Sequence, residues 1–381
     1  MDARHSILSY LRHPVQPVYP KAIAAVFSFG LFGYLLLVAG VLKPDLIDHI
    51  RVSEKLMNGE VKIGHPVFFF LIQLLSGFTK NLNAEIFAAF LIFSVAQFLK
   101  ITLSVSLAEH FLKKPASWFL WLGIIAAQLA ISSTLFSRHY IIGSLSPNYF
   151  HNGTLSLSFP FALFFLLESL RFLEDEDRKH LGRMLMAGLL LVATKPSFLF
   201  VWIPVMPFFV LFKFGPGRKL LGILQISVFM VMLILAQSML LKSSQADFKV
   251  VFYPFFFFGS AINHVLVLIS ALLLPLTIFL FYPKDFSLQP QNQLLFLFTI
   301  QGLLLSFLFH DTIRGIVSPN MTWQSSMVHY LWLVSSVAFL DEELTKRRYL
   351  RMALPALVLL SLVFSSLRYL HLSSQIRSFF L

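Results

Sequence analysis

Apolar runs of about 20 residues recur along the whole chain, and this feature constrains the fold more than any other. A helix needs ~20 mostly apolar residues to cross the hydrocarbon core of a bilayer. Of the 381 residues, 57% are hydrophobic and 13% are charged, and no stretch is polar enough to form a separate soluble domain. The sequence therefore predicts an all-α polytopic transmembrane bundle of about ten or eleven spans, forming one domain over residues 1–381.

The spans are expected at 22–42, 84–108, 117–136, 154–170, 184–194, 197–212, 220–241, 264–282, 292–309, 326–340 and 352–370. The apolar stretch 184–212 is long enough for two passes if it breaks at Lys195-Pro196. Proline lacks a backbone donor and bends or ends a helix, so we expect a helical hairpin there.

The basic residues predict the orientation of these spans. With a cytoplasmic N-terminus, the inner segments hold 17 of the 30 Lys and Arg residues and the outer segments hold 11. Cytoplasmic loops collect positive charge, so this orientation is favoured. It requires the 14 residues at 65–78, HPVFFFLIQLLSGF, to form an interfacial or re-entrant helix, because they are too few to span comfortably. The first outer segment is then 43–83.

Several function classes are disfavoured. The chain has no cysteine, which excludes disulfides and thiolate metal sites. Its net charge of +12 fits basic cytoplasmic loops, and no nucleic-acid partner is expected. Nucleotide-binding, zinc-protease and hydrolase motifs do not occur in a useful context.

With this topology, the unusual polar residues concentrate on the outer side of the membrane. Ionisable groups gathered at one membrane face beside helix ends indicate a functional site. The residues are Asp45, Asp48, His49, His65, Arg138, His139, Asn148, His151, Asn152, Lys195, His310, Asp311 and Arg314.

Asp45 follows the first span directly, and Asp48 and His49 come next in a helix-compatible stretch. A carboxylate at a span end can accept a proton from an attacking hydroxyl group. The alternative is a helix cap, since aspartate is favoured in a first turn. Three apolar positions of this stretch are expected to lie on the membrane surface: Leu46, Ile50 and Val52.

The pattern Asp45-x-x-x-His49, followed by Glu54-Lys55-Leu56-Met57, Gly59 and His65-Pro66, resembles the first outer loop of the GT-C superfamily of polytopic glycosyltransferases. The resemblance implies a GT-C-like fold. It also implies that a carboxylate just after the first span acts as a base or positions the acceptor. The loop then runs through an amphipathic helix into a juxtamembrane helix headed by His-Pro.

The stretch 146–154, SPNYFHNGT, resembles uncharacterised membrane proteins of bacterial polysaccharide pathways. The matching residues are Ser146, Pro147, Asn148, His151, Asn152 and Thr154. Lys195-Pro196 resembles the Lys-Pro at a hairpin tip of many such enzymes. Many GT-C members carry a second acidic residue after the third span, and 137–153 has none. That role is either absent, as in metal-independent members, or taken over by His151 and Asn148. We expect a site without metal.

The resemblance implies an inverting glycosyltransferase of the bacterial inner membrane, acting at the outer face. Its partners would be a polyprenyl-phosphate-linked sugar donor and a glycan or lipid acceptor, and no cofactor beyond that donor is expected. The expected catalytic residues are Asp45, Asp48 and His49. The expected substrate-binding residues are His65, Arg138, His139, Asn148, His151, Asn152, Lys195, Asp311 and Arg314.

Two other functions stay open at this point. A polymerase or ligase of lipid-linked glycans would depend on outer arginine and histidine residues instead of Asp45. A transporter or flippase of a lipid-linked substrate would need ionisable residues near the middle of the bilayer. Lys100 and Arg368 are expected toward span ends, which weighs against ion-coupled transport.

Overall fold

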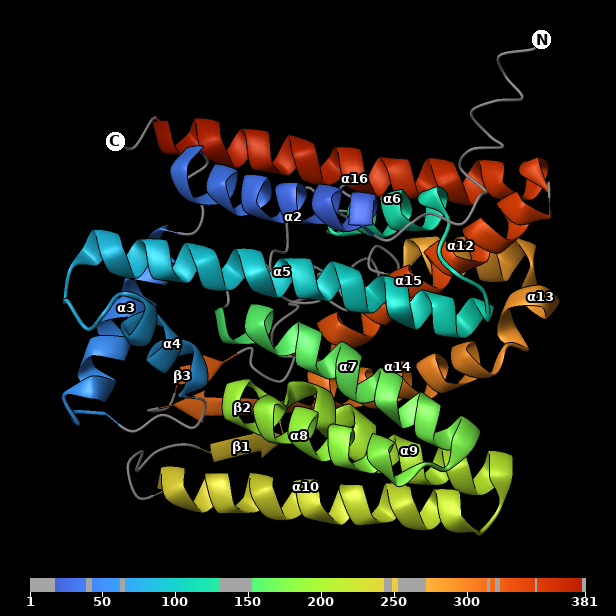
Figure 1. Cartoon of the computed structure of the whole chain (residues 1–381), viewed down its shortest axis with the longest axis horizontal. Coiled ribbons are helices and arrows are strands. Elements are labelled where there is room, and N and C mark those ends of the chain that lie inside the picture. The colour runs from blue at the N-terminus through green and yellow to red at the C-terminus, as the bar shows by residue number, and fades with distance from the viewer. Residues whose placement is uncertain are drawn as a thin grey trace.

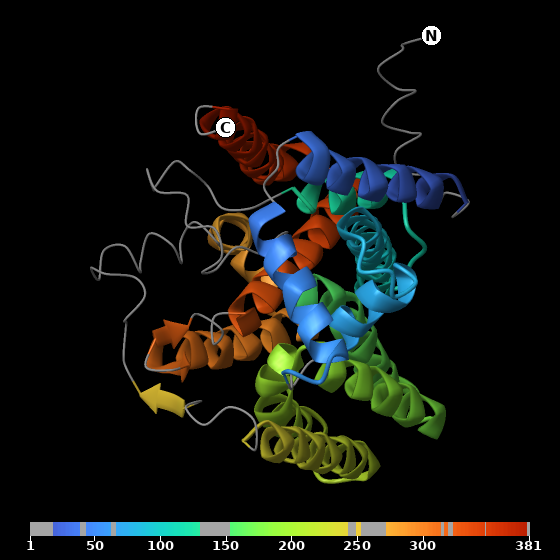
Figure 2. The same cartoon turned by 90° about the vertical axis from the view of Figure 1, so that its left-hand side faces the viewer.

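Most of the chain forms long helices that run along the longest axis of the molecule (Figures 1 and 2). The computed structural model describes residues 18–38, 43–61, 66–129, 153–242, 249–252, 272–313, 316–318, 323–346 and 348–378. The helices of the first part are α2 (Val18–Gly33), the π-helical η1 (Tyr34–Val38), α3 (Lys43–Met57), α4 (Val67–Leu75), α5 (Leu82–Leu112), α6 (Trp118–Ala127) and α7 (Gly153–Asp175). The later helices are α8 (Arg178–Thr194), the 3-10 turn η2 (Pro196–Phe198), α9 (Leu199–Phe214), α10 (Arg218–Lys242), α12 (Leu273–Phe281), α13 (Pro283–Ser287), α14 (Pro290–Leu308), α15 (Trp323–Thr345) and α16 (Tyr349–Ser378).

Five helices within the described residues are long and apolar enough to cross a membrane. They comprise Val18–Leu36, Leu82–Leu112, Gly153–Asp175, Pro196–Phe214 and Arg218–Met239. This confirms a membrane protein built from helices. The full number of ten or eleven spans stays a prediction, as does the GT-C arrangement.

The connections of the chain gather at two ends of the bundle (Figure 1). At one end lie the connections α5–α6, α7–α8, α9–α10, α13–α14 and α15–α16, which are the segments predicted to be cytoplasmic. At the other end lie α3, α4, the α8–α9 connection and three short strands. We call this second end the sheet end. The charges predict that successive connections lie on alternate sides of the membrane, and the described connections do alternate between the two ends of the bundle. Which side of the membrane each end faces stays a prediction.

The predicted break of 184–212 is confirmed. Helix α8 ends at Thr194, Lys195 is extended, and α9 begins at Leu199 after the single turn η2. The amide N–H of Lys195 donates to the carbonyl of Leu191 at 2.7 Å, but Pro196 has no N–H to continue the helix. The chain therefore reverses at the sheet end and returns as α9.

The described residues are mostly helical, as the all-α prediction expects, but they also contain one small sheet that was not predicted. Three antiparallel strands pair in the order β1 (Lys249–Phe252), β2 (Phe309–Ile313) and β3 (Ile316–Ser318). Lys249 pairs with Thr312 and Phe252 with Phe309. These segments lie in or next to the predicted outer segments 242–263 and 310–325, and only their long-range pairing identifies them as strands. The pairing places the segments after α10 and α14 at the same end of the bundle.

Close helix packing in this bundle depends on individual glycines. A β-carbon at Gly123 of α6 would lie 2.6 Å from Val337 Cγ1 on α15, whereas a β-carbon at Gly182 of α8 would meet nothing within 4 Å. Valine is stiff about its first side-chain torsion and has little freedom to turn aside. The two glycines therefore form a matched pair, one at a tight helix contact and one in open space.

We expect Gly123→Ala to destabilise the protein by about 1–3 kcal/mol through overpacking against α15. Gly182→Ala is the control, and it should be neutral or stabilising by up to about 1 kcal/mol because alanine favours a helix. Melting temperatures in detergent micelles measure both effects. Equal melting temperatures would contradict the close α6–α15 contact.

Candidate functional site

The structure describes the side chains of three of the predicted site residues, Asp48, His49 and Lys195. For Asp45, in the first turn of α3, and Asp311, in β2, the backbone is described. Asp311 pairs with Val250 on one side and Ser318 on the other. The other predicted residues lie outside the described ranges: His65, Arg138, His139, Asn148, His151, Asn152 and Arg314.

Asp48 and His49 lie on different faces of α3. The Asp48 side chain is 72% exposed and accepts a hydrogen bond from Arg51 at 3.4 Å. The His49 ring lies against α4, with its centroid 5.6 Å from that of Phe68 and 5.5 Å from that of Phe69. Asp48 therefore faces solvent, whereas His49 faces the bundle.

The apolar residues of α3 do not lie on a membrane surface, which corrects that prediction. Leu46 and Ile50 are buried in a core cluster with α4 and α5, and Val52 packs against the cluster. Helices α4 and α5 offer an apolar face only a few residues further along the chain, so burial within the protein replaces burial in lipid. Helix α3 is thereby fixed to the sheet end of the bundle.

Helix α4, which belongs to the first outer segment, packs against the start of α7, where the second outer segment ends. A β-carbon at Gly153, the first residue of α7, would lie 2.2 Å from Phe68 Cζ, so glycine permits the approach of this ring. The same ring contacts His49. The segment 146–152 leads directly into Gly153. Because of this contact, the beginning of α7 lies beside the first outer loop, as the predicted topology requires.

Lys195 lies at the same end of the molecule. It follows the last residue of α8, and its side chain is 7% exposed. Helix α4 also contacts α8. The structure thus brings α3 with His49, the start of α7 and the hairpin tip with Lys195 to one end around α4 (Figure 1).

A buried polar group at this end was missed by the sequence analysis. The side-chain amide of Gln73 on α4 donates to Ser53 Oγ on α3 and to Glu85 Oε1 on α5, each at 2.6 Å. Glu85 is fully buried, and its second oxygen has no hydrogen-bond partner among the described residues. The signal in the sequence that could have identified this group is the carboxylate of Glu85 at the start of an apolar run, because an ionisable group is costly in a membrane. The group joins three helices and holds α3 in place.

A second buried polar group lies in the middle of the bundle. Gln97 donates to Gln128 at 3.0 Å, Gln128 donates to the Tyr330 hydroxyl at 2.5 Å, and that hydroxyl lies 2.8 Å from Ser104 Oγ. Next to this chain of hydrogen bonds, Lys100 Nζ lies 3.9 Å from the centroid of the Tyr330 ring.

The position of Lys100 corrects the sequence analysis, which placed it toward a span end. Helix α5 has 31 residues centred on Gln97, so Lys100 lies one turn from its middle. The side chain is 4% exposed, and the Phe159 ring centroid lies 4.2 Å from its Nζ. Aromatic faces stabilise a cation that has been removed from water. Lys100 is already four residues from the midpoint of the predicted span 84–108, and the structure adds that its side chain is enclosed by aromatic rings.

Across the described part of the chain, no three or more histidine or acidic side chains gather closely enough to hold a metal ion. Metal independence stays a prediction.

No protein-family model matches the chain, and no curated protein sequence matches it significantly. The resemblance to GT-C enzymes therefore depends on the quoted motifs alone.

We expect Gln73→Leu to lower the free energy of unfolding by about 1–3 kcal/mol, because it leaves the buried Glu85 carboxylate without its donor. The matched control is Gln225→Leu, since Gln225 is exposed on α10. Thermal unfolding in detergent micelles compares the two variants. If both melt with the wild type, Gln73 does not hold α3 against α5.

Proposed function

We propose that the chain is a membrane glycosyltransferase that uses a polyprenyl-phosphate-linked sugar donor. The main supporting observation is the packing of α4 against α3, the start of α7 and the end of α8. This packing gathers, at one end of a bundle of membrane-spanning helices, two elements that carry expected site residues, α3 and the hairpin tip, and the start of α7, which follows segment 146–152 in the sequence. A donor with a membrane-embedded chain presents its phosphate and sugar at such an end.

The proposed reaction is a single displacement at the anomeric carbon of the sugar. The acceptor hydroxyl oxygen forms a bond to that carbon, and the bond from the carbon to the phosphate oxygen breaks. The polyprenyl phosphate leaves with the electron pair, and the hydroxyl proton passes to the Asp45 carboxylate. Attack from the side opposite the leaving phosphate inverts the anomeric configuration.

The residues around α4 have separate roles in this proposal. Asp45, in the first turn of α3, is the base, and His49 lies one turn further on, where α3 packs on α4. Lys195, at the hairpin tip, stabilises the charge that develops on the departing phosphate. Asp48 is exposed and paired with Arg51, so no observation on its side chain favours a catalytic role.

The proposed location is the bacterial inner membrane, with the sheet end at the outer face. The excess of Lys and Arg in the connections at the opposite end supports this orientation. Acceptors such as growing glycans or lipids are then reached from outside the cytoplasm.

Transport of a lipid-linked substrate is the second candidate function. The observation in its favour is Lys100, a cation buried near the middle of α5 between Phe159 and Tyr330. Ionisable residues deep in a membrane often mark a substrate or ion pathway.

We expect Asp45→Asn to reduce glycosyl transfer by at least about 100-fold without loss of folded protein, because the amide cannot accept the proton. The control is Glu60→Gln, which changes an exposed carboxylate of the same outer segment. In a strain lacking the chain, mass spectrometry of lipid extracts should show accumulation of one polyprenyl-phosphate-linked sugar. Wild type and Glu60→Gln should remove it, and Asp45→Asn should not.

Two results would contradict the proposal. A well-expressed Asp45→Asn variant that restores the wild-type lipid profile would exclude Asp45 as the base. In the strain lacking the chain, the lipid-linked sugar could also accumulate only on the inner side of the membrane, where an impermeant oxidant cannot reach it. That result would favour the transporter, because loss of a transferase that acts outside leaves the unused donor exposed on the outer side.

We expect Lys195→Gln to raise KM for the lipid-linked donor and to lower kcat, because a neutral amide holds phosphate more weakly than a cation does. Lys55→Gln is the control, since Lys55 is exposed near the end of α3. Transfer of a radiolabelled sugar from the donor identified above, in membrane vesicles, separates the two constants. Unchanged constants for Lys195→Gln would exclude a role for Lys195 in phosphate binding.

A further inference from the structure

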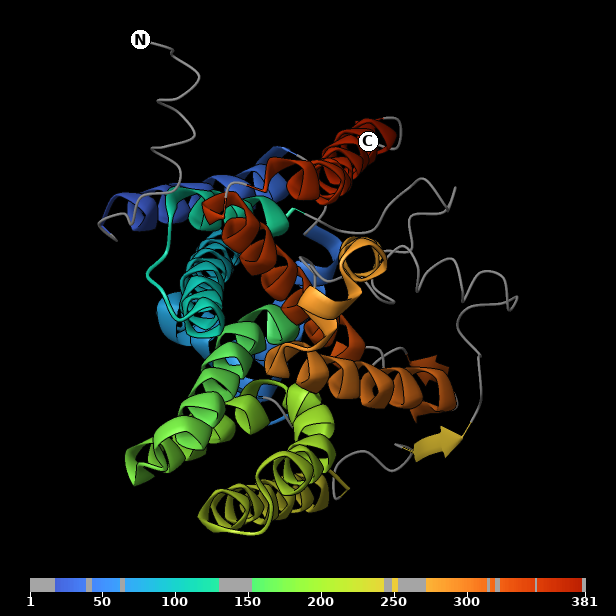
Figure 3. The same ribbon diagram turned by 90° about the vertical axis from the view of Figure 1, so that its right-hand side faces the viewer.

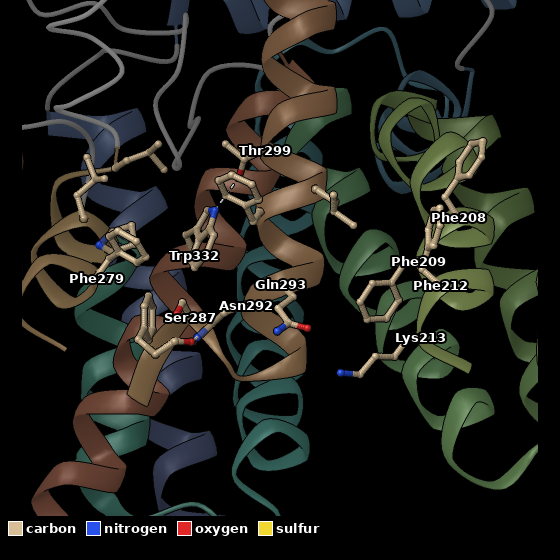
Figure 4. A pocket seen from close by; sticks show the side chains of 16 residues that line it. Phe208, Phe209, Phe212, Lys213, Phe279, Ser287, Asn292, Gln293, Thr299 and Trp332 are labelled. Carbon is tan, nitrogen blue, oxygen red and sulfur yellow. Dashed lines mark hydrogen bonds between the residues drawn. The ribbon is translucent and has the colours of Figure 1, made fainter. Parts of the chain in front are cut away.

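A cleft of about 760 Å³ lies between α9 and α12, with α14 and α15 behind it (Figure 4). Figure 3 shows these helices from the side. The volume is in the range of pockets that bind small molecules. The lining residues are Phe208, Phe209, Phe212, Lys213, Leu272, Pro275, Leu276, Phe279, Phe286, Ser287, Asn292, Gln293, Phe296, Leu297, Thr299 and Trp332.

The walls of the cleft are suited to hydrocarbon. Phe208 and Phe212 on α9 and Phe279 on α12 all line the cleft, and all three are among the more exposed large apolar residues of the described chain. Trp332 turns its polar N–H away, donating it to Thr299 Oγ1 at 2.7 Å. An acyl chain can therefore contact aromatic and aliphatic carbon along the cleft without meeting an unpaired donor from Trp332.

Most of the polar side chains of the cleft lie at one end. Lys213 and Gln293 stand on opposite walls near Ser287, whereas Thr299 and Trp332 lie further along (Figure 4). From Asn292 to Thr299 the cleft follows α14 for roughly 10 Å, at 1.5 Å per residue. The polar end belongs to the end of the bundle opposite the sheet end.

Lys213 supplies a positive charge that no described carboxylate neutralises. Two other cations at this end of the bundle are paired: Arg351 lies 2.5 Å from Asp285, and Lys219 lies 3.9 Å from Glu176. Among the described residues, no acidic side chain lines the cleft and no hydrogen bond is made by the side chain of Gln293. A cation and an amide at the mouth of an apolar cleft are complementary to an anionic headgroup.

We propose that this cleft binds an anionic phospholipid. Its phosphate lies between Lys213 and the Gln293 amide, and one acyl chain lies along Phe208, Phe212 and Phe279. The site is at the opposite end from Asp45 and Lys195, so the proposal does not depend on glycosyl transfer. With the orientation proposed above, the lipid comes from the cytoplasmic leaflet.

Native mass spectrometry of the full chain released from micelles tests this proposal, with phosphatidylglycerol and phosphatidylcholine as probes. We expect the protein to retain more phosphatidylglycerol than phosphatidylcholine. The Lys213→Gln substitution should reduce this preference for phosphatidylglycerol about fivefold. The matched control is Arg178→Gln, an exposed cation at the same end of the bundle but outside the cleft, which should change nothing. Equal retention of both lipids, or equal effects of the two substitutions, would overturn the proposal.

A spectroscopic measurement places the lipid at the cleft. The chain has five tryptophans, so replacing the other four with phenylalanine leaves Trp332 as the reporter. Phosphatidylglycerol with brominated acyl chains should quench it more than brominated phosphatidylcholine, and Lys213→Gln should abolish the difference. If the variant with four tryptophans replaced does not fold, the mass-spectrometric comparison alone tests the proposal. Preferential binding of added polyprenyl phosphate over phosphatidylglycerol at this site would also overturn the proposal.

Discussion

The structure depends on the packing of α5 against its neighbours. This helix contacts α2, α3, α4, α6, α7 and α15, and buried residues occur along most of its length. At 31 residues it is about 46 Å long, more than the ~30 Å hydrocarbon core requires, so its ends reach the interfaces. Two ionisable side chains of α5 are tolerated because surrounding helices supply partners. Glu85, near one end, accepts a hydrogen bond from Gln73, and Lys100, near the middle, lies against the Phe159 and Tyr330 rings.

Features set by local chemistry could be predicted from the sequence. The break at Lys195-Pro196 follows from the missing proline donor, and the short helix α4 follows from an apolar run bounded by Pro66 and Gly77. Features that need a distant partner could not be predicted. The apolar face of α3 packs on α4 and α5, β1 pairs with β2 some 60 residues away, and Lys100 lies against the Phe159 and Tyr330 rings. Hydropathy measures how apolar a segment is but not which surface covers it.

The candidate site likewise has features that the sequence predicted and features that it did not. Sequence reasoning placed the first outer loop, the start of α7 and the hairpin tip together, and α4 joins these elements in the structure. It did not find Glu85 and Gln73, whose significance lies in a hydrogen bond between helices. It also treated Asp48 and His49 alike, although adjacent residues of a helix point in different directions, and only His49 faces α4.

The small sheet has a mechanical consequence for the last part of the chain. Strand β2 follows α14 directly, so its pairing with β1 holds the end of α14 to the segment after α10. A helix held at one end has less freedom to move away from its neighbours, and α14 contacts α9. Moving α14 away from α9 then works against the pairing of β1 with β2. The fit of any molecule between α9 and α12 is therefore set partly by hydrogen bonds at the far end of the bundle.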